Sequence, residues 1–481
     1  MNISSIAVVG DSLAAWTAAA MLAKHFAQQI KICVLEIPVP DDASAESAMP
    51  SLREFHRLLN IKEREFFQAT DATFKLATHY RDWLRPSHSY WLGVGDCGMS
   101  LDGVEFQHYA NLLHQCGDST AYDAYSLTVQ AARKRKFNPL SNSQQAAGFQ
   151  LPYTMHLDTA SYKKMLRDYA IAMGVTAIGG ELAQAELTLE SGKLRQLQAD
   201  FFIDCTGAAG KLIENLAPGE FVRDGLGCDR RLSWIEPSPA DIPNHTTLSA
   251  HAYGWQKTIP LRTEVHQHYF YSSEFLSDAQ ALEIIKQQTT EDVQLANLHS
   301  GYRPNPWVKN CLALGEAANG GGQLGLSNLH LVHTGILRFI ELFPSVESPA
   351  FAQEYNRLTA LEYERVAHFQ QLPFALSQRD ESNFWRVNKM HALPDALSHS
   401  IDLFKQRGKI ASHEQETFSS PSWAAMFLAN QCWPQKYDPR LSGIKLEQLQ
   451  QHTAAMKTGI QQIVTAMPSH AEYLQAYCSN T

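Results

Sequence analysis

The N-terminal segment constrains the fold most, because it reads as a strand, a turn, a helix and a second strand. Residues 6–9 are a short apolar run, and Gly10 follows as a turn. Residues 14–26 have the composition of an apolar helix, and residues 32–35 form a second apolar run that ends at Glu36. In the βαβ layout of a dinucleotide site, a helix N-terminus faces a pyrophosphate and an acid after the second strand accepts hydrogen bonds from a ribose. The pattern predicts an α/β fold with Glu36 in that role.

The glycine fingerprint of such a site is imperfect in this chain. In the register G-x-G-x-x-G the three positions are Gly10, Ser12 and Ala15. Ala15 preserves the close packing of helix on strand, whereas the side chain of Ser12 crowds the approach to the phosphates. A generic α/β N-terminus is the alternative interpretation. We assign cofactor binding to Gly10, Ser12, Leu13, Ala14 and Ala15.

Two later segments support the cofactor interpretation. Residues 201–207 are an apolar strand that runs into Asp-Cys-Thr-Gly, and residues 310–316 are a strand that ends at Gly315 and Glu316. Together with the N-terminal segment they resemble the FAD-binding elements of p-hydroxybenzoate-hydroxylase-like flavoproteins. The resemblance implies that Gly315 and Glu316 bind the cofactor, with the acid near the ribityl chain. The alternative is three unrelated strands of an α/β protein.

The remaining sequence alternates between helical and strand patterns. Residues 229–290 read as strands, with a turn at 253–254 and a helix that starts at Ser277. A polar loop covers residues 412–422. Helical patterns cover residues 51–85, 158–173, 354–371, 395–406 and 445–466.

These elements predict an α/β flavoprotein in which a Rossmann-type FAD domain is interrupted by a mixed β-sheet substrate lobe and followed by a helical C-terminal cap. The predicted domains are discontinuous in sequence. The FAD domain takes residues 1–85, 155–225 and 300–345, the sheet lobe takes residues 86–154 and 226–299, and the cap takes residues 346–481.

The composition narrows the classes of function. The chain has 40 Lys and Arg against 49 Asp and Glu, a net charge of −9, and no basic run, so neither nucleic-acid binding nor binding to an anionic membrane is expected. No apolar run approaches the roughly 20 residues that span a bilayer, and the N-terminus has no basic leader. The scattered cysteines form no CxxC pair, which predicts mostly buried thiols and a cytoplasmic location.

No metal site is expected in this chain. The histidines do not form an HxxxH pair on a helical face with a carboxylate nearby. His266 and His268 alternate in a predicted strand, so they share one face of it. A solvent-facing or pocket-lining position is the simplest interpretation of both.

Short segments spread over nearly the whole chain follow the order of one enzyme family. A glycine turn followed by tryptophan runs from Gly10 to Trp16, and Ala-Thr-Phe-Lys-Leu at 72–76 is followed by Trp83. Further segments are 43–50 (Ala-Ser-Ala-Glu-Ser-Ala-Met-Pro), 156–158 with Tyr162, 202–205, 254–261 (Gly-Trp-Gln-Lys-Thr-Ile-Pro-Leu), 355–356, 383–385 and 422–423. In this order and spacing they resemble the flavin-dependent tryptophan halogenase superfamily. Within that resemblance, 43–50 is similar to the strap beside the flavin, and 254–261 to the W-x-W-x-I-P signature.

The resemblance implies an oxidoreductase whose FAD is reduced (FADH2) by a separate NAD(P)H-dependent flavin reductase and then reacts with O2 to a C4a-hydroperoxide. Chloride or bromide attacks that peroxide, and the resulting hypohalous acid reaches a small indole- or phenol-like substrate held away from the flavin. The resemblance also suggests a homodimer.

The resemblance assigns roles to individual residues. It implies Lys75 as the catalytic residue, which holds hypohalous acid or forms a haloamine with it; an ordinary surface lysine near a predicted helix is the alternative. Further cofactor contacts are expected at Glu46, Ser47, Gly322 and Leu324. Substrate contacts are expected at Trp255, Ile259, Pro260, Trp385 and Trp423, with core packing as the alternative for the tryptophans.

The chain also departs from the family pattern. The family segment Gly-Phe-Val-Glu-Pro-Leu-Glu-Ser-Thr-Gly-Ile-His aligns with residues 319–330, so that the glutamate that pairs with the lysine becomes Gly325. The Ser-Thr pair beside the halide becomes Leu326-Ser327, and the second tryptophan of the signature becomes Lys257. Residues 319–322 are glycine-rich, which predicts either free N–H groups for a flavin or anion, or a flexible loop.

Three hypotheses follow from the matches and the departures. The first is a FAD-dependent halogenase of an aromatic substrate. The second is a flavin-dependent monooxygenase or oxidase that acts on an aromatic without halogenation, which the loss of the glutamate favours. The third is a non-catalytic flavin-binding relative, which the imperfect turn at residues 10–12 would permit.

Overall fold

A largely parallel sheet of six strands is the centre of the first of two units into which the chain divides. Its strand order is β17-β18-β11-β1-β2-β8, and β17 alone runs antiparallel to its neighbour. The bounds are β1 (Ser5–Val9), β2 (Lys31–Leu35), β8 (Thr176–Ile178), β11 (Phe201–Asp204), β17 (Trp307–Val308) and β18 (Cys311–Ala313). The central strands are buried on both faces, which explains their continuous apolar sequences.

The computed structural model describes residues 3–26, 29–39, 44–101, 103–179, 189–190, 193–194, 198–223, 227–321, 324–325, 327–344, 348–390 and 392–479. The first unit comprises Met1–Ala72, Leu157–Gly225 and Leu298–Ala367, and the second comprises Thr73–His156, Leu226–Asn297 and His368–Thr481.

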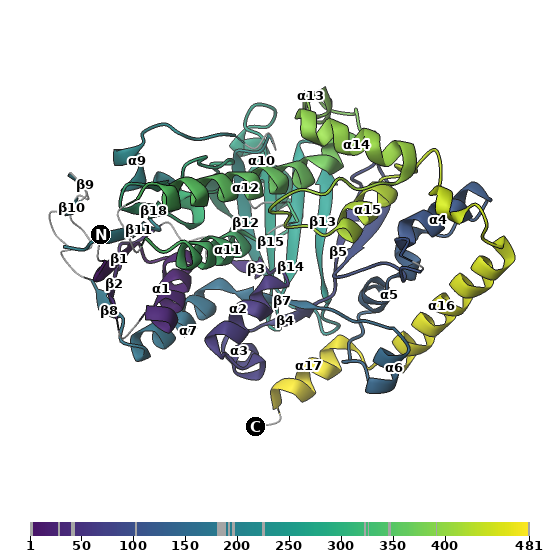
Figure 1. Ribbon diagram of the computed structural model, residues 1–481, viewed down its shortest axis with the longest axis horizontal. Coiled ribbons are helices and arrows are strands. Elements are labelled where there is room, and N and C mark those ends of the chain that lie inside the picture. The colour runs from purple at the N-terminus through teal and green to yellow at the C-terminus, as the bar shows by residue number, and fades with distance from the viewer. Residues whose placement is uncertain are drawn as a thin grey trace. The chain divides into compact units, whose positions relative to one another are not determined.

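Helices cover the parallel sheet of the first unit. α1 packs against α7 and α11, and α2 packs against α11 (Figure 1). Asp158 caps α7, because its carboxylate accepts from the N–H of Ser161 at 2.7 Å. The bounds are α1 (Leu13–Phe26), α2 (Ser51–Leu59), α3 (Glu63–Ala69), α7 (Thr159–Ala172), α9 (Ile213–Leu216), α11 (Asn328–Glu341) and α12 (Ala350–Leu376), with short strands β3 (Ala45–Ser47), β9 (Leu189–Glu190) and β10 (Lys193–Leu194).

A seven-stranded, mostly antiparallel sheet is the centre of the second unit. Its order is β16-β12-β15-β14-β13-β5-β6, and the long strands lie side by side in Figure 1. β4 (Thr73–Lys75) pairs antiparallel with β7 (Thr154–Asp158) beside it. The bounds are β5 (Ala77–Arg81), β6 (Ser89–Gly93), β12 (Arg230–Pro237), β13 (His245–His251), β14 (Gly254–Pro260), β15 (Glu264–Tyr271) and β16 (Gln294–Asn297).

Helices from three parts of the sequence belong to the second unit. α16 lies beside α4 and α5 (Figure 1). Ser277 and Gln280 form a capping box at the start of α10. The bounds are α4 (Phe106–Gln115), α5 (Leu127–Arg133), α6 (Asn142–Ala146), α10 (Asp278–Lys286), α13 (Asn383–Met390), α14 (Asp395–Arg407), α15 (Ser420–Ala429), α16 (Leu446–Ala466) and α17 (His470–Ser479).

The predicted elements need correction at three places. The helical pattern at 51–85 was wrong beyond residue 72, because residues 73–75 and 77–81 form β4 and β5. Apolar or aromatic residues at 74, 76 and 80 alternate there with polar ones at 75, 79 and 81, which fits the period of a strand. The loop predicted at 412–422 ends earlier, because α15 begins at Ser420, and α17 was not predicted.

The division into units differs from the predicted domains in three respects, one of which is that residues 350–367, predicted as part of the cap, belong to the unit of the parallel sheet. Residues 73–85 belong to the unit of the antiparallel sheet and not to that of the parallel sheet. The C-terminal helices from residue 368 group with the antiparallel sheet, whereas a separate cap was predicted. Within the described part of the chain, no helix is long and apolar enough to cross a membrane, and no group of side chains is arranged to hold a metal ion.

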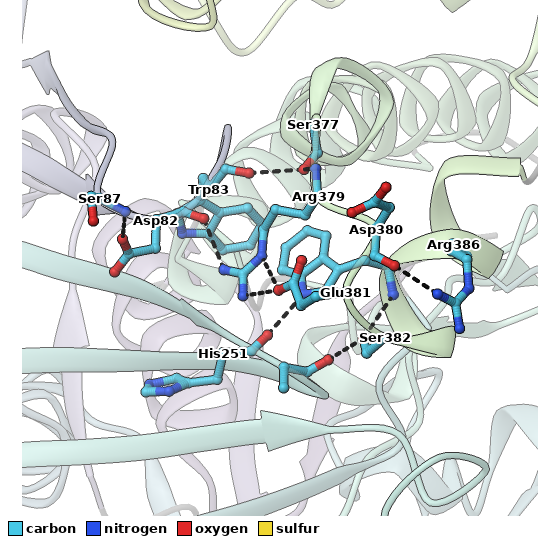
Figure 2. Close-up of polar contacts among 12 residues, drawn as sticks. Asp82, Trp83, Ser87, His251, Ser377, Arg379, Asp380, Glu381, Ser382 and Arg386 are labelled. Carbon is cyan, nitrogen blue, oxygen red and sulfur yellow. Dashed lines mark hydrogen bonds and ion pairs between the residues drawn. The ribbon is translucent and has the colours of Figure 1, made fainter.

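An aromatic cluster on the antiparallel sheet is held by one buried arginine. Arg379 lies over the ring of Trp385, with 4.6 Å from its guanidinium carbon to the ring centroid. Figure 2 shows it between the carbonyl of Asp82, which accepts at 2.8 Å, and the carboxylate of Glu381, 2.6 Å from its Nε. Trp385 itself donates to the carbonyl of His251 at 2.8 Å. Arg379 therefore ties the start of α13 to β13 and to the turn after β5.

We expect Arg379→Ala to lower the free energy of unfolding by about 2–3 kcal/mol, because it removes a cation–π contact and leaves polar partners without a donor. Urea unfolding measures this. Arg386→Ala is the matched control, since Arg386 makes exposed contacts to Asp380 and Asn383 and should change stability by less than about 0.5 kcal/mol. Equal effects of the two substitutions would contradict the prediction.

Candidate functional site

The turn after β1 requires glycine. Gly10 has φ +123°, and a Cβ there would lie 2.3 Å from the carbonyl oxygen of Cys205. Its N–H donates to Leu35 O at 2.9 Å. The turn is therefore pressed between the ends of β11 and β2, and no other residue fits.

Ser12 closes this turn rather than projecting from it. Its hydroxyl donates to Cys205 O at 3.2 Å and accepts from the N–H of Ala15 at 3.2 Å. The N–H groups of Leu13 and Ala14, in the first turn of α1, have no acceptor inside the helix. An anion at this helix start would meet those two groups.

The carboxyl ends of three parallel strands bring the predicted cofactor residues together. Gly315 has φ +64°, and a Cβ there would lie 2.7 Å from Cβ of Ala14. A Cβ on Gly207 would lie 4.0 Å from Oε2 of Glu316. The glycine turn, the end of β11 and the Gly315–Glu316 pair therefore adjoin one another, at the strand ends where α/β sheets bind ligands.

Asp204 has a structural role in the Asp-Cys-Thr-Gly segment. Its Oδ1 accepts from the N–H and hydroxyl of Thr206, and its Oδ2 accepts from the N–H groups of Leu212 and Ile213 at 2.8 and 2.9 Å. All of its lone-pair directions are thus used to hold the chain that follows β11.

Glu36 lies at the end of β2, as predicted, but its carboxylate already has a partner. Arg167 of α7 donates to Oε1 at 2.7 Å, and its guanidinium carbon is 5.3 Å from the ring centroid of Trp16. A ribose bound here would share the carboxylate with Arg167. Its contact with a ribose stays a prediction.

The strap is anchored to the start of α7. Ser44 and Thr159 exchange hydrogen bonds, at 3.1 Å from Ser44 N–H to Thr159 Oγ1 and 2.7 Å from Thr159 Oγ1 to Ser44 O. Glu46 and Ser47 follow on β3, where Ser47 is buried. Ala43 lies outside the described residues.

The glycine-rich run is neither a flexible loop nor a row of free donors where it is described. Gly320 N–H donates to Gly301 O at 2.9 Å, and Gly321 N–H donates to Asn319 Oδ1 at 2.7 Å. A Cβ on Gly320 would lie 2.1 Å from His299 O. Glycine is needed here for close pairing with the preceding chain. Gly322, a predicted cofactor contact, lies outside the described residues.

The segment that the resemblance aligns with the family glutamate leads into α11. Gly325 has φ +73°, a conformation that L side chains rarely adopt, and Leu324 is buried. Ser327, the N-cap of α11, is 1% exposed, and its hydroxyl oxygen has no hydrogen-bond partner among the described residues. This buried hydroxyl lies beside the N–H groups that open a helix of 14 residues.

A buried polar network joins α2, which follows the strap at residues 43–50, to α11, which follows residues 319–327. Ser51 Oγ, at the start of α2, lies 2.8 Å from Nδ1 of His330 in α11. Nε2 of His330 lies 3.7 Å from Glu362 of α12, and Arg338 donates to the same carboxylate at 2.9 Å. The ends of the strap and of the 319–327 segment are therefore held to one another.

Lys75 lies in the second unit, on β4. It is 5% exposed, so the surface-lysine alternative is wrong, as is its predicted place near a helix. Lys75 pairs across the ladder with Thr154. On the opposite face of the strand, the ring of Phe74 stacks on Phe137 with centroids 4.1 Å apart.

His156 is held in one neutral tautomer beside Lys75. Thr73 donates its hydroxyl proton to Pro260 O at 2.7 Å, so its oxygen accepts from Nδ1–H of His156 at 2.9 Å. Nε2 of His156 then accepts from the hydroxyl of Thr246 at 3.0 Å. Burial holds the pKa of His156 well below its ordinary value, and the charge of Lys75 lowers the pKa further.

His470 joins the C-terminal helix to β4. Its Nε2 accepts from the N–H of Phe74 at 3.3 Å, so its Nδ1–H donates to Ile242 O at 3.0 Å. The ring is fully buried, which lowers the pKa of His470 to about 4. The strand of Lys75 is thus fixed by β7 on one edge and by an imidazole on the other.

The predicted substrate residues are buried. Trp255 and Trp385 are at most 1% exposed and belong to the aromatic cluster with Trp83, whose ring centroid is 6.0 and 5.8 Å from theirs. Ile259 is buried on the same strand as Trp255, and Pro260 accepts from Thr73. Trp423 packs against Phe369 at 5.0 Å. These surroundings agree with core packing, which was the alternative interpretation of the tryptophans. Their contact with a substrate stays a prediction.

Comparison with known proteins agrees with this arrangement. The family model described as tryptophan halogenase matches residues 5–445. The chain belongs to the tryptophan halogenase family. The predicted fold class and the predicted enzyme class, a flavin-dependent halogenase, are confirmed.

Relatives match along their full lengths. BrvH, a flavin-dependent halogenase from Brevundimonas sp. BAL3, is 29% identical with a TM-score of 0.92, over 99% of each chain. Xcc4156, a flavin-dependent halogenase from Xanthomonas campestris, is 28% identical with a TM-score of 0.92, over 99% of each chain. Tryptophan 6-halogenase SttH from Streptomyces toxytricini is 24% identical over 99% of this chain and 98% of its own.

In this halogenase-family chain, sequence reasoning missed the residues that fix the lysine strand. His470 lies 396 positions from Phe74, and no local pattern marks it. His266 and His268 are buried, so the solvent-facing alternative is wrong for both; His268 instead lies 3.1 Å from Ser233 Oγ.

We expect the wild type to lose about 2 kcal/mol more stability between pH 7 and pH 5 than His470→Gln loses. A histidine whose folded pKa lies near 4 contributes stability above its ordinary pKa of about 6.5, and this contribution is lost as the pH falls towards 4. Urea unfolding at both pH values measures the difference.

The exposed His452 supplies the control for this measurement. His452→Gln should keep the pH dependence of the wild type. An unchanged pH dependence in His470→Gln would contradict the assignment.

Proposed function

We propose that this chain uses reduced FAD, O2 and chloride or bromide to halogenate a small electron-rich aromatic, such as an indole or a phenol, with Lys75 holding the halogenating agent. The observation that carries the proposal is Lys75 itself, buried on a short strand beside a histidine kept neutral. A buried ammonium next to uncharged donors and acceptors is suited to hold an oxyacid of a halogen or to take up its halogen.

The described residues of the first unit fit a flavin dinucleotide. The N–H groups of Leu13 and Ala14 would take the pyrophosphate, Glu36 with Arg167 the adenosine ribose, and Gly315 with Glu316 the ribityl chain. The closed turn at Gly10 and Ser12 supports binding in spite of the imperfect fingerprint, and so weakens the non-catalytic hypothesis. When bound, reduced FAD supplies the two electrons that activate O2.

The start of α11 is suited to the halide. Ser327 keeps the hydroxyl of the family threonine, buried and without a partner in the described part of the chain. The hydroxyl and the first N–H groups of α11 would donate to chloride or bromide, which the positive end of the helix favours. Strap residues Glu46 and Ser47 stay proposed as cofactor contacts.

Direct oxygenation without halogenation is the second candidate, and Gly325 favours it. The family glutamate is replaced by glycine at a positive φ, so the acid–base assistance of that carboxylate, roughly 10²–10⁴-fold, has no side chain at this position. Halogenation of a very electron-rich ring needs such assistance least.

The partners and the location are also proposals. A separate NAD(P)H-dependent flavin reductase would supply the reduced flavin, and a homodimer is proposed from the family resemblance. A cytoplasmic location is supported by the eight cysteines, each of which is described and has a free thiol.

We expect Lys75→Met to abolish halogenation. Mass spectrometry of a reaction with FAD, a flavin reductase, NADH, O2, bromide and a panel of indoles and phenols should show the bromine isotope doublet for the wild type, and at least about 100-fold less of it for the variant. Lys164→Met at an exposed position of α7 is the control. Undiminished bromination by Lys75→Met would refute the role of Lys75, and a +16 product without bromine would favour oxygenation.

We expect Ser327→Ala to raise the bromide concentration for half-maximal rate about tenfold, with little change at saturating bromide, because one hydrogen bond to an anion is lost. The control is Ser419→Ala, which changes the N-cap of α15, another helix without a side-chain capping bond. An unchanged bromide dependence would place the halide elsewhere.

A further inference from the structure

A cavity of about 340 Å³ lies in the second unit. This volume is within the usual range of small-molecule sites. Its walls come from the chain after β6, from α4, η1 (Tyr122–Tyr125) and α5, from the segment before β7 and from α16. Its lining includes Asp96, Glu105, Phe106, Tyr122 and Tyr125.

Backbone pairing joins the cavity wall to Lys75. Val94 N–H donates to Leu76 O at 2.8 Å, directly after Lys75. A Cβ on Gly95 would lie 2.3 Å from Cγ of Pro152, a cavity residue two positions before Thr154, the partner of Lys75 in the β4–β7 ladder. The wall and the lysine strand are therefore parts of one hydrogen-bonded framework.

The interior of the cavity is aromatic and tightly packed. Phe106 meets Tyr125 edge to face with centroids 4.9 Å apart. A Cβ on Gly98 would lie 2.2 Å from the Phe106 ring, so the ring packs on a position that only glycine can occupy. Tyr125 is 4% exposed; burial raises the pKa of its hydroxyl, and hydrogen bonds with Thr120 and Thr453 lower it. Such a site suits a flat aromatic ring with one polar group.

The charge of the cavity is negative. Among its described lining residues, the charged side chains are Asp96 and Glu105 alone. Both carboxylates act on Tyr122, whose pKa burial raises well above its ordinary value and both acids raise further.

Positive groups near the cavity have other partners. Nε2 of His108 lies 3.3 Å from Glu105, but burial lowers the pKa of His108. Arg440 pairs with Asp438 at 2.7 Å, and Lys457, over the Tyr125 ring, donates to Thr120 at 3.2 Å. None of these three residues lines the cavity.

We propose that this cavity receives the substrate, and that it selects an aromatic carrying a protonated amine and no carboxylate. The ring would enter the aromatic interior, and the ammonium would stay at the wetter side, where Asp96 is exposed and Glu105 is 39% exposed. A carboxylate on the ligand would meet two like charges there. The inference rests on the proposed function in so far as the bound aromatic is to be halogenated. Its binding to the cavity does not depend on that function.

Isothermal titration of the full-length protein with tryptamine, tryptophan and indole-3-propionate tests the selection. These three share the indole ring and differ in charge. We expect tryptamine to bind at least about tenfold more tightly than indole-3-propionate, with tryptophan between them. Equal affinities, or preference for the acid, would overturn the proposal.

Two variants test whether the two carboxylates are responsible. Asp96→Asn combined with Glu105→Gln should weaken tryptamine about fivefold or more and leave uncharged indole unchanged. Glu283→Gln, at an exposed position of α10, is the control and should change neither. Undiminished tryptamine binding by the double variant would overturn the assignment, provided its thermal unfolding matches that of the wild type.

A parallel bromination assay separates this inference from the proposed function. If indole is brominated but tryptamine has no advantage in binding, the selection is wrong and the halogenase proposal stands. If tryptamine binds as expected but neither compound is brominated under conditions that reduce the flavin, the selection stands and the proposed chemistry fails.

Discussion

A lysine can be buried on a short strand only if the histidines around it remain uncharged. Lys75 is 5% exposed, and its charge acts directly on His156. Two threonines fix the proton of His156 on Nδ1, and a backbone N–H occupies Nε2 of His470. Protonation of His470 would break its bond from the N–H of Phe74, because the acceptor nitrogen would become a donor facing a donor. The burial of Lys75 therefore depends on neutral histidines nearby. The residues that keep these histidines neutral come from three distant parts of the chain.

In the first unit, glycine is required at two positions because neighbouring elements pack too closely to admit a side chain. Gly10 and Gly315 each occupy positions where a Cβ would come within 3 Å of a neighbouring element. This close approach brings the helix start of α1 to the ends of β11 and β18. Ser12 can replace the second glycine of the fingerprint because its hydroxyl is hydrogen-bonded to the backbone of Cys205 and Ala15. The departure from the pattern thus leaves the geometry of the turn intact.

The sequence predicted the parts of the fold that depend on local pattern. The β1-α1-β2 unit, β11 and β18 are continuous apolar runs with glycine turns, and α7 and α16 have clear helical periodicity, so each was found within a few residues. β4 and β5 were missed because strands of three and five residues carry too few positions to oppose a helical neighbourhood. The contact of His470 with Phe74, and the grouping of the C-terminal helices with the antiparallel sheet, arise only from tertiary structure.

For the candidate site too, the sequence indicated some residues, whereas tertiary contacts decided what those residues do. Family resemblance pointed to Lys75 and the strap, whose roles stay predictions, whereas the glycine content of residues 319–322 predicted free donors or a flexible loop. The N–H groups of Gly320 and Gly321 are already used within the fold, so the glycines serve close backbone packing. Sequence shows which side chains are absent, whereas the hydrogen-bond partners decide which donors remain available.

The resemblance implies that Gly325 stands where the family has a glutamate, and such a change would involve the backbone as well as the side chain. Gly325 lies at φ +73°, where an L residue is strained by roughly 1–2 kcal/mol, so the chain that leads into α11 follows a path suited to glycine. An enzyme with this path must accept a weaker proton acceptor or choose a substrate that loses its ring proton easily. Indoles with an aminoalkyl chain belong to the electron-rich aromatics, and their ammonium group is what a cavity bordered by Asp96 and Glu105 would bind. Substrate choice and the missing carboxylate can therefore have the same physical origin, because a reactive ring needs less help from the protein than the family glutamate provides.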